Sequence, residues 1–338
     1  MNAQKLETLP PPPGVIGSLR TGFEVVSSHV LLILMPLSLD LFLWLGPRVS
    51  VNKLLNPAFA LLFEQMRASL PTAQDAVRVD EAQKLMIDWL QRFNLISLLS
   101  RLQTFPIGIS SLMSKVMPVD SPFGEQAILQ VPSIFAYLAY TFLLVVIGWV
   151  ISGLYFRWVS GTVLGNWDRS FGAVGAIGQT FLLSVIWLLT LIALSIPILI
   201  VLLLLTLISP ALASAGGFLM LVLSFWLIVP LYFTPHGIFV RRQNAFYSIY
   251  SSLRMARFTL PTSGLFVFSV FILSAGLNYL WSIPASDSWM LLFGLFGHAF
   301  ITTALLAASF VYYRDMNAWL QIVLENLQQK NSSRARQA

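Results

Sequence analysis

The sequence predicts an all-α integral membrane protein, a six-helix bundle with an extracytoplasmic amphipathic helical segment between its first two spans. Two observations predict this fold class. Hydrophobic residues make up 57% of the 338 residues and charged residues 10%, whereas a soluble domain carries roughly 25% charged residues. Six apolar stretches approach or exceed the about 20 residues that a helix needs to cross a bilayer. Together these observations exclude a soluble enzyme and a disordered chain.

The six predicted spans are the longest apolar stretches of the chain, at residues 23–46, 133–156, 176–208, 217–233, 263–283 and 289–313. A polar, proline-rich tail, residues 1–22, precedes the first span without a cleavage pattern, so we expect that span to be retained. The third span would be roughly 50 Å long as a straight helix. It must therefore tilt, kink at Pro197 or project from the bilayer. The last five spans form one region, residues 133–315, followed by a second tail, residues 316–338.

The distribution of Lys and Arg predicts the orientation of the chain in the membrane. The side with both tails carries twelve basic and five acidic residues, and the opposite side carries eight of each. Because short basic loops stay in the cytoplasm, both termini are predicted to be cytoplasmic in a bacterial-type plasma membrane. The net charge of +6 then reflects orientation and contact with anionic lipid. No nucleic-acid-binding motif is present, and no nucleic-acid partner is expected.

The long segment between the first two spans, residues 47–132, is predicted to form an extracytoplasmic helical cap. Apolar residues recur at three- and four-residue spacing over 57–70 and again over 80–103, which is the pattern of amphipathic helices. Residues 105–117 are apolar but interrupted by Pro106 and Gly108. These helices either lie on the outer membrane surface or form a lid or docking site over a central cavity.

Three polar side chains inside predicted spans are candidates for an intramembrane site. At a rise of 1.5 Å per residue, Asp40 lies about 9 Å, Asn278 about 8 Å and His298 about 14 Å below the outer ends of their spans. If those spans adjoin, a carboxylate, an amide and an imidazole can meet. Such a cluster either carries protons or cations, or fixes helix packing through hydrogen bonds.

A basic loop on the cytoplasmic side is the second candidate site. Residues 234–262 contain Arg241, Arg242, Arg254 and Arg257 and no acidic residue. Aromatic and aliphatic residues between them predict an amphipathic helix with its arginines on lipid phosphates. A dedicated headgroup site or a membrane-protein partner is the alternative.

The final spans carry a packing signal rather than a catalytic one. Small residues recur along the last span at Gly294, Gly297, Ala304 and Ala308, a spacing typical of close helix–helix approach. The three histidines match no metal-ligand spacing, no nucleotide-binding or nucleophile motif is present, and the chain has no cysteine. We therefore expect no metal, no cofactor and no catalytic residues.

The second half of the chain contains a set of short motifs, namely Pro235-His-Gly-Ile-Phe-Val240, Ala245, Ser252-Leu253 and Ala307-Ala-Ser-Phe-Val-Tyr312-Tyr313-Arg314-Asp315. Through them, residues 230–315 resemble the membrane domain attached to some bacterial glycerophosphodiester phosphodiesterases and related multi-helix proteins. The chain departs from that pattern at Arg241-Arg242, where an acidic residue is common, and it lacks the catalytic domain. The resemblance implies an accessory membrane role.

Two functions follow from these observations. The first is a non-enzymatic accessory or scaffold protein that binds membrane lipids or a membrane-protein partner. The alternative is a permease-like transporter with a proton- or cation-linked polar site at Asp40, Asn278 and His298. The two differ in whether those residues border a polar cavity.

Overall fold

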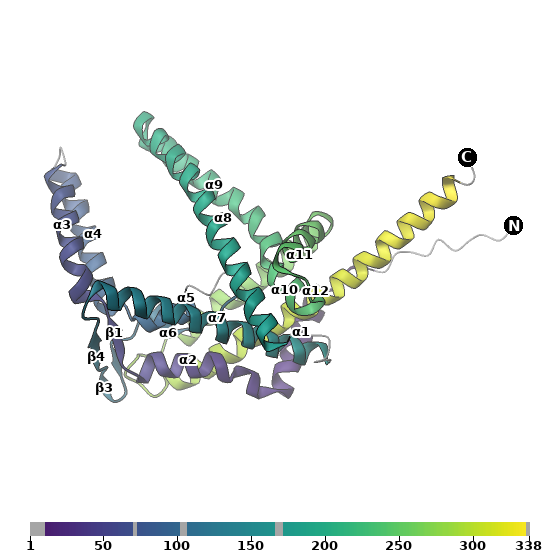
Figure 1. Cartoon of the computed structure of the whole chain (residues 1–338), viewed down its shortest axis with the longest axis horizontal. Coiled ribbons are helices and arrows are strands. Elements are labelled where there is room, and N and C mark those ends of the chain that lie inside the picture. Colours follow the sequence, from purple (N-terminus) through teal and green to yellow (C-terminus); the bar gives the residue numbers. More distant parts are fainter. Residues whose placement is uncertain (1–10, 70–72, 102–106, 166–171, 336–338) are drawn as a thin grey trace. The chain divides into compact units, whose positions relative to one another are not determined.

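The computed structural model describes residues 11–69, 73–101, 107–165 and 172–335, and its regular structure is almost entirely helical (Figure 1). This confirms the predicted all-α class. The long apolar helices are α7 (Ile134–Leu164), α8 (Ala173–Ile208), α9 (Pro210–Tyr232), α11 (Ala245–Trp281) and α12 (Leu291–Ala335). The remaining helices are α1 (Val15–Ser28), η1 (Val30–Ile33), α2 (Leu34–Leu45), α3 (Asn52–Ala68), α4 (Ala73–Arg92), η2 (Leu95–Ser97), α5 (Leu98–Arg101), α6 (Met113–Val116) and α10 (Thr234–Arg241).

The helices long and apolar enough to cross a membrane number four to six among the described residues. Four qualify singly, namely α7, α8, α11 and the Leu291–Gln328 part of α12. Two more qualify only if a bent pair counts as one span, and these pairs are Val15–Ser28 with Val30–Leu45 and Pro210–Ser224 with Val229–Arg241. Such helices indicate a membrane protein.

The chain divides into two units. The first comprises Met1–Val30, Phe156–Ser274 and Thr303–Ala338, and the second comprises Leu31–Tyr155 and Ala275–Thr302. Each unit is therefore built from segments far apart in the sequence, and several long helices contribute to both.

The first unit has an aromatic core. Phe266 stacks on Tyr312 with ring centroids 4.2 Å apart, and Phe233 stacks on Tyr312 at 5.7 Å. Val229, Met255 and Ala308 belong to the same buried cluster. The α8–α9 hairpin belongs to the same unit, and its two helices pack along each other. Many apolar side chains of this hairpin are exposed, for example Leu207, as expected of helices surrounded by lipid.

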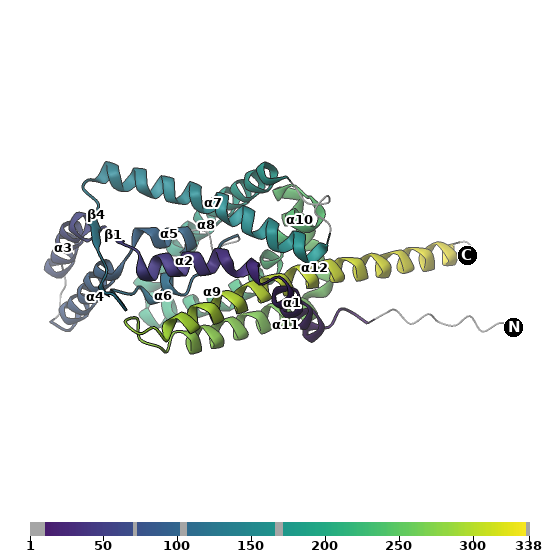
Figure 2. The ribbon, with the colours of Figure 1, turned by 90° about the horizontal axis from the view of Figure 1, so that it is seen from below.

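The second unit contains α2 and the segment predicted as a cap. A short parallel ladder joins β1 (Arg48–Ser50) to β4 (Ile128–Gln130), and a hairpin joins β2 (Asp120–Ser121) to β3 (Gly124–Glu125). Helices α3 and α4 pack together as a helical hairpin (Figure 2). Within the same unit, a buried apolar cluster is formed by Val51, Leu90, Phe93, Leu95 and Val131. The predicted amphipathic helices are therefore present, although their bounds differ.

The first predicted span, residues 23–46, is not a continuous helix. Helix α1 ends at Ser28, and α2 begins only at Leu34, after the short 3-10 helix η1. His29, which ends α1, has φ −132° and ψ 60°, and these angles are not helical. The apolar run 23–46 therefore contains a break in helical geometry that hydropathy alone does not reveal.

Three other predicted boundaries also differ from the structure. Helix α1 begins at Val15, inside the predicted tail 1–22, whose first ten residues lie outside the described chain. The predicted tail 316–338 continues α12 as far as Ala335. The basic loop and the fifth span share α11, which departs from helical geometry at Thr259, two residues before Pro261. A proline removes one helical hydrogen bond, and here it bends the helix without ending it.

Candidate functional site

Asp40 lies on α2 and is fully buried within the second unit. Its Oδ1 accepts a hydrogen bond from the Ser111 hydroxyl at 2.5 Å and another from the Met113 backbone N–H at 3.0 Å. Both donors come from the segment 107–117, which the sequence placed in the outer cap. The carboxylate thus anchors that segment on the apolar helix α2.

His298 lies between Asn278 and Asp40 and contacts both of them. Its Nδ1 lies 2.6 Å from the Asn278 Oδ1, and because an amide oxygen only accepts, Nδ1 donates this bond. Its Nε2 lies 3.8 Å from the Asp40 Oδ2 and 3.5 Å from the Ser110 hydroxyl. The structure therefore brings Asp40, Asn278 and His298 into one cluster, together with two serines that the sequence analysis did not select.

Hydrogen bonds made by buried serines support the segment that faces Asp40. The Ser111 Oγ accepts from the Ser114 backbone N–H at 3.0 Å, and Ser100 donates to the Ile109 carbonyl at 2.9 Å. All four of these residues are buried. The only local signal in the sequence is three serines between positions 110 and 114 of an otherwise apolar stretch. The acceptor of Ser111, Asp40, lies 71 residues earlier in the chain, where periodicity cannot identify it.

The chemistry available to this cluster is limited by its burial. Asp40 and His298 are both 0% exposed, and neither lines any of the three pockets considered below. Across the described ranges, no three His, Asp or Glu side chains come together as a metal site would require. The contacts are those of a buried polar network that fixes one arrangement of its segments.

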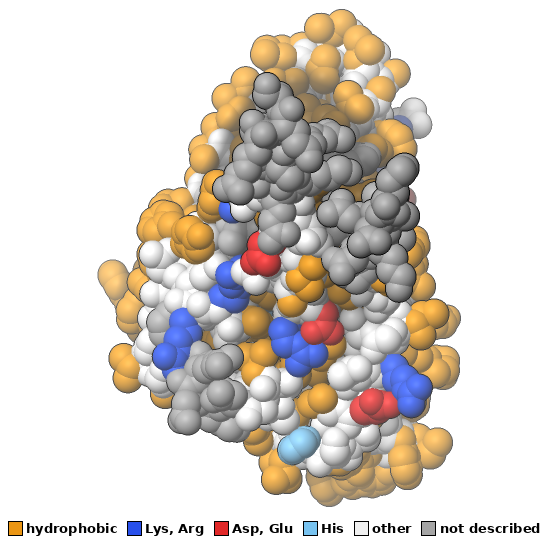
Figure 3. Space-filling model, turned by 90° about the vertical axis from the view of Figure 1, so that its right-hand side faces the viewer, with side chains coloured by type: hydrophobic (Ala, Val, Ile, Leu, Met, Phe, Trp, Pro, Cys, Tyr) orange, Lys and Arg blue, Asp and Glu red, His pale blue; other side chains and the backbone are white. Residues whose placement is uncertain are grey.

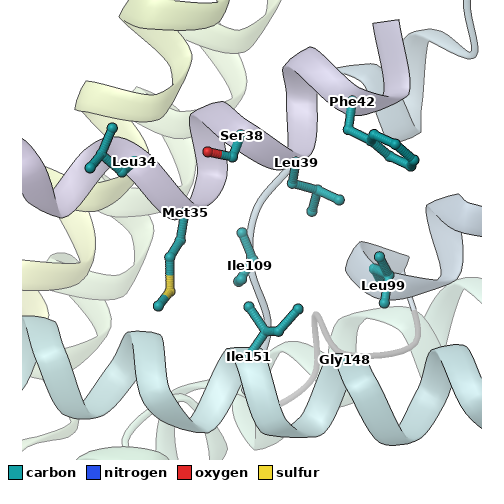
Figure 4. A pocket seen from close by; sticks show the side chains of 9 residues that line it. All are labelled: Leu34, Met35, Ser38, Leu39, Phe42, Leu99, Ile109, Gly148 and Ile151. Carbon is teal, nitrogen blue, oxygen red and sulfur yellow. The ribbon is translucent and has the colours of Figure 1, made fainter. Parts of the chain in front are cut away.

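An apolar pocket of about 330 Å³ lies on another side of α2 (Figure 4). In Figure 4, side chains of α2 face α7 across the pocket, and Leu99 and Ile109 close a further side. The lining residues are Leu34, Met35, Ser38, Leu39, Phe42, Leu99, Ile109, Gly148 and Ile151. Among these nine, only Ser38 carries a side-chain oxygen or nitrogen.

The four predicted arginines occupy different environments in the first unit. Arg241 and Arg254 line one small polar pocket, of about 160 Å³, with Tyr247 and Asn317. The Arg241 Nη1 donates to the Asn317 Oδ1 at 3.4 Å. All four arginines are exposed, and Arg242 and Arg257 are not part of that lining. The structure therefore pairs two of the four around one pocket.

Charged side chains are sparse on the surface of the molecule. Figure 3 shows one face on which Lys, Arg, Asp and Glu side chains gather between apolar patches. Two of the exposed charge pairs in the first unit are local, namely Arg20 with Glu24 at 2.7 Å and Arg314 with Asp315 at 2.7 Å. Exposed pairs of this kind contribute little to stability.

Comparison of the chain with protein-family models, with curated proteins and with solved structures finds no match.

Proposed function

We propose that this protein is a non-enzymatic, multi-pass membrane accessory or scaffold protein that binds a lipid acyl chain in the apolar pocket between α2 and α7. The single observation that carries the proposal is the lining of that pocket, which has one polar side chain, Ser38, among nine residues. Its volume of about 330 Å³ lies within the range of small-ligand pockets. A polar solute would lose its hydrogen bonds there, whereas a hydrocarbon chain loses none.

The surroundings of the pocket favour a lipid over other apolar ligands. Helix α7 is one of the helices apolar enough to span a membrane, and Leu34 and Phe42 of α2 are partly exposed beside it. A lipid chain entering from the bilayer leaves one hydrocarbon medium for another, so the hydrophobic effect contributes little. The gain comes instead from dispersion contacts with a lining whose shape is already formed.

Filling the pocket is expected to remove a bound lipid. We predict that Ser38→Phe lowers, by at least fivefold, the fraction of protein molecules that keep a lipid after extraction into lipid particles. Native mass spectrometry of the released protein measures this fraction. Ser195→Phe is the matched control, because Ser195 is exposed on α8, outside the pocket lining. Equal retention in the wild type and in both variants would exclude the pocket as the lipid site.

The proposed setting is a bacterial-type plasma membrane with both termini in the cytoplasm. The excess of basic residues on the side of the two tails supports this orientation. The short motifs of residues 230–315, from which we infer a resemblance to the membrane domain of glycerophosphodiester phosphodiesterases, would fit an accessory role near lipids. On this orientation, Arg241, Arg242, Arg254 and Arg257 contact lipid phosphates or a membrane-protein partner.

Transport linked to protons is the second candidate, and one observation favours it. The Asp40 Oδ2 has no hydrogen-bond partner among the described residues and lies 3.8 Å from His298. The closed packing of the cluster argues against transport, because Asp40 and His298 are fully buried and line none of the three pockets. We expect proteoliposomes of the wild type and of Asp40→Asn to show the same low proton flux under an imposed pH gradient. A wild-type flux that Asp40→Asn abolishes would favour transport.

A further inference from the structure

A second pocket in the second unit surrounds a buried arginine. Arg48 is the first residue of β1, whose ladder with β4 fixes its backbone, and its own N–H donates to the Ala127 carbonyl at 2.8 Å. The residue is only 4% exposed, and its side-chain Nε and Nη1 have no hydrogen-bond partner among the described residues. Buried guanidinium nitrogens without acceptors are costly, so an acceptor for Nε and Nη1 is expected at this position.

The pocket beside Arg48 has a volume of about 370 Å³ and a polar lining. Its lining residues are Arg48, Ser50, Asn52, Asp88, Gln91, Arg92, Val119, Ile128 and Gln130. They include four neutral side chains that donate or accept hydrogen bonds. One of them, Asn52, has a buried Oδ1 that also lacks a partner. Two different lining residues therefore have unmet hydrogen-bonding capacity.

The charges around the pocket leave Arg48 incompletely neutralised. Asp88, the one acid in the lining, already accepts from the Arg92 Nε at 3.0 Å. Burial lowers the pKa of Arg48 from its ordinary value, and attraction to the exposed Asp120 opposes this lowering. No ion pair joins Asp120 to Arg48 among the described contacts. The lining itself therefore carries one unbalanced positive charge.

We propose that the pocket at Arg48 binds a small organic monoanion, a carboxylate whose other polar groups are neutral hydroxyls or amides. A guanidinium fits the geometry of a carboxylate and forms charge-assisted hydrogen bonds with it. A single excess charge matches a carboxylate better than a phosphate dianion. Ser50, Asn52, Gln91 and Gln130 supply partners for the neutral groups. This inference does not rest on the acyl-chain pocket, which lies elsewhere in the unit.

The test measures thermal unfolding of the full chain in detergent, with sodium acetate, lactate, gluconate or phosphate at constant ionic strength in place of chloride. We expect gluconate and lactate to raise the apparent Tm by about 2–4 °C, because a ligand that binds only the folded state stabilises it. Acetate, with no hydroxyl groups, should give a smaller rise. A rise with phosphate alone, or no rise with any of these anions, would overturn the proposal.

Three variants assign the effect to the pocket. Arg48→Met should abolish the rise, and Arg67→Met is its matched control, because Arg67 is an exposed arginine of α3 outside the lining. Gln91→Trp keeps Arg48 but narrows the pocket from an exposed position. If Arg48→Met does not fold, Gln91→Trp tests whether the anion binds in this pocket. The same rise in Gln91→Trp as in the wild type would place the anion elsewhere.

Discussion

Replacement of Asp40 by alanine is expected to destabilise the second unit by about 2–5 kcal/mol. The substitution leaves the buried Ser111 hydroxyl and the Met113 N–H without their acceptor. Each unmet buried donor costs about 1–3 kcal/mol. The free energy of unfolding, measured by titration with SDS in mixed micelles, checks this expectation. Because both donors lie in the segment 107–117, that segment should become accessible to proteolysis before the rest of the chain.

Two further variants separate the hydrogen bonds of Asp40 from its charge. Asp40→Asn keeps an oxygen that accepts from Ser111 and Met113, so it should cost much less than alanine. Ser111→Ala removes one donor and should cost about 1–3 kcal/mol. In a double-mutant cycle, Asp40→Ala and Ser111→Ala should be clearly non-additive, because the two side chains are in contact. Additive costs would mean that the Ser111–Asp40 bond does not hold the segment.

Replacement of Gly22 by leucine is expected to destabilise the first unit by about 3 kcal/mol. A Cβ atom at Gly22 would lie 2.5 Å from the Ala308 backbone N and 2.6 Å from the Ala304 carbonyl O. These are backbone atoms of α12, so a side chain fits only if α1 moves away. Overpacking of this kind typically costs 1–3 kcal/mol and occasionally more. The same SDS titration measures the loss.

Gly17 provides the control on the same helix. A Cβ atom there has no neighbour within 4 Å. Leucine is a better helix former than glycine by nearly 1 kcal/mol, so Gly17→Leu should be neutral or slightly stabilising. If Gly17→Leu and Gly22→Leu have equal effects, the close approach of α1 to α12 is not a source of stability.

Composition and hydropathy predict the features of this chain that depend on local sequence. The all-α class, the apolar helices and the amphipathic pair now seen as α3 and α4 belong to this group. Each is determined by residues one to four positions apart, which is the range over which periodicity carries information. The stripe containing Ala304 and Ala308 likewise predicts close packing, although only the structure shows Gly22 as its partner.

Features that depend on distant partners are not predicted from the sequence. The break at His29 interrupts an apolar run with no proline or glycine at that point. At Pro261 the sequence misleads in the other direction. A proline suggests the end of a helix, but α11 continues through it. The helix has a kink at Thr259, whose hydroxyl bonds to the Met255 carbonyl at 2.8 Å and to the Ser263 hydroxyl at 2.8 Å.

Some residues of the candidate site can be identified from the sequence, and others cannot. Asp40, Asn278 and His298 are recognisable because polar groups are rare in apolar spans. The serines that bond to Asp40 and His298 are small and common, and nothing local distinguishes them. The burial of Arg48 is likewise not predictable from its neighbours in the sequence. An arginine just outside a span is expected to be an exposed charge, whereas in the structure Arg48 pairs with Ile128 in the ladder of β1 with β4 and is buried.

The most direct test of the proposed function is photolabelling of the wild-type protein with a lipid that carries a diazirine in its acyl chain. The protein is loaded in proteoliposomes, diluted into excess unlabelled lipid, illuminated and analysed by peptide mass spectrometry. A chain held in the pocket exchanges slowly, so adducts should concentrate on residues 34–42 and 148–151, and Ser38→Phe should remove them. Exposed residues 199–208 of α8 should lose their label on dilution. Equal labelling of both regions after dilution would contradict a dedicated lipid site between α2 and α7.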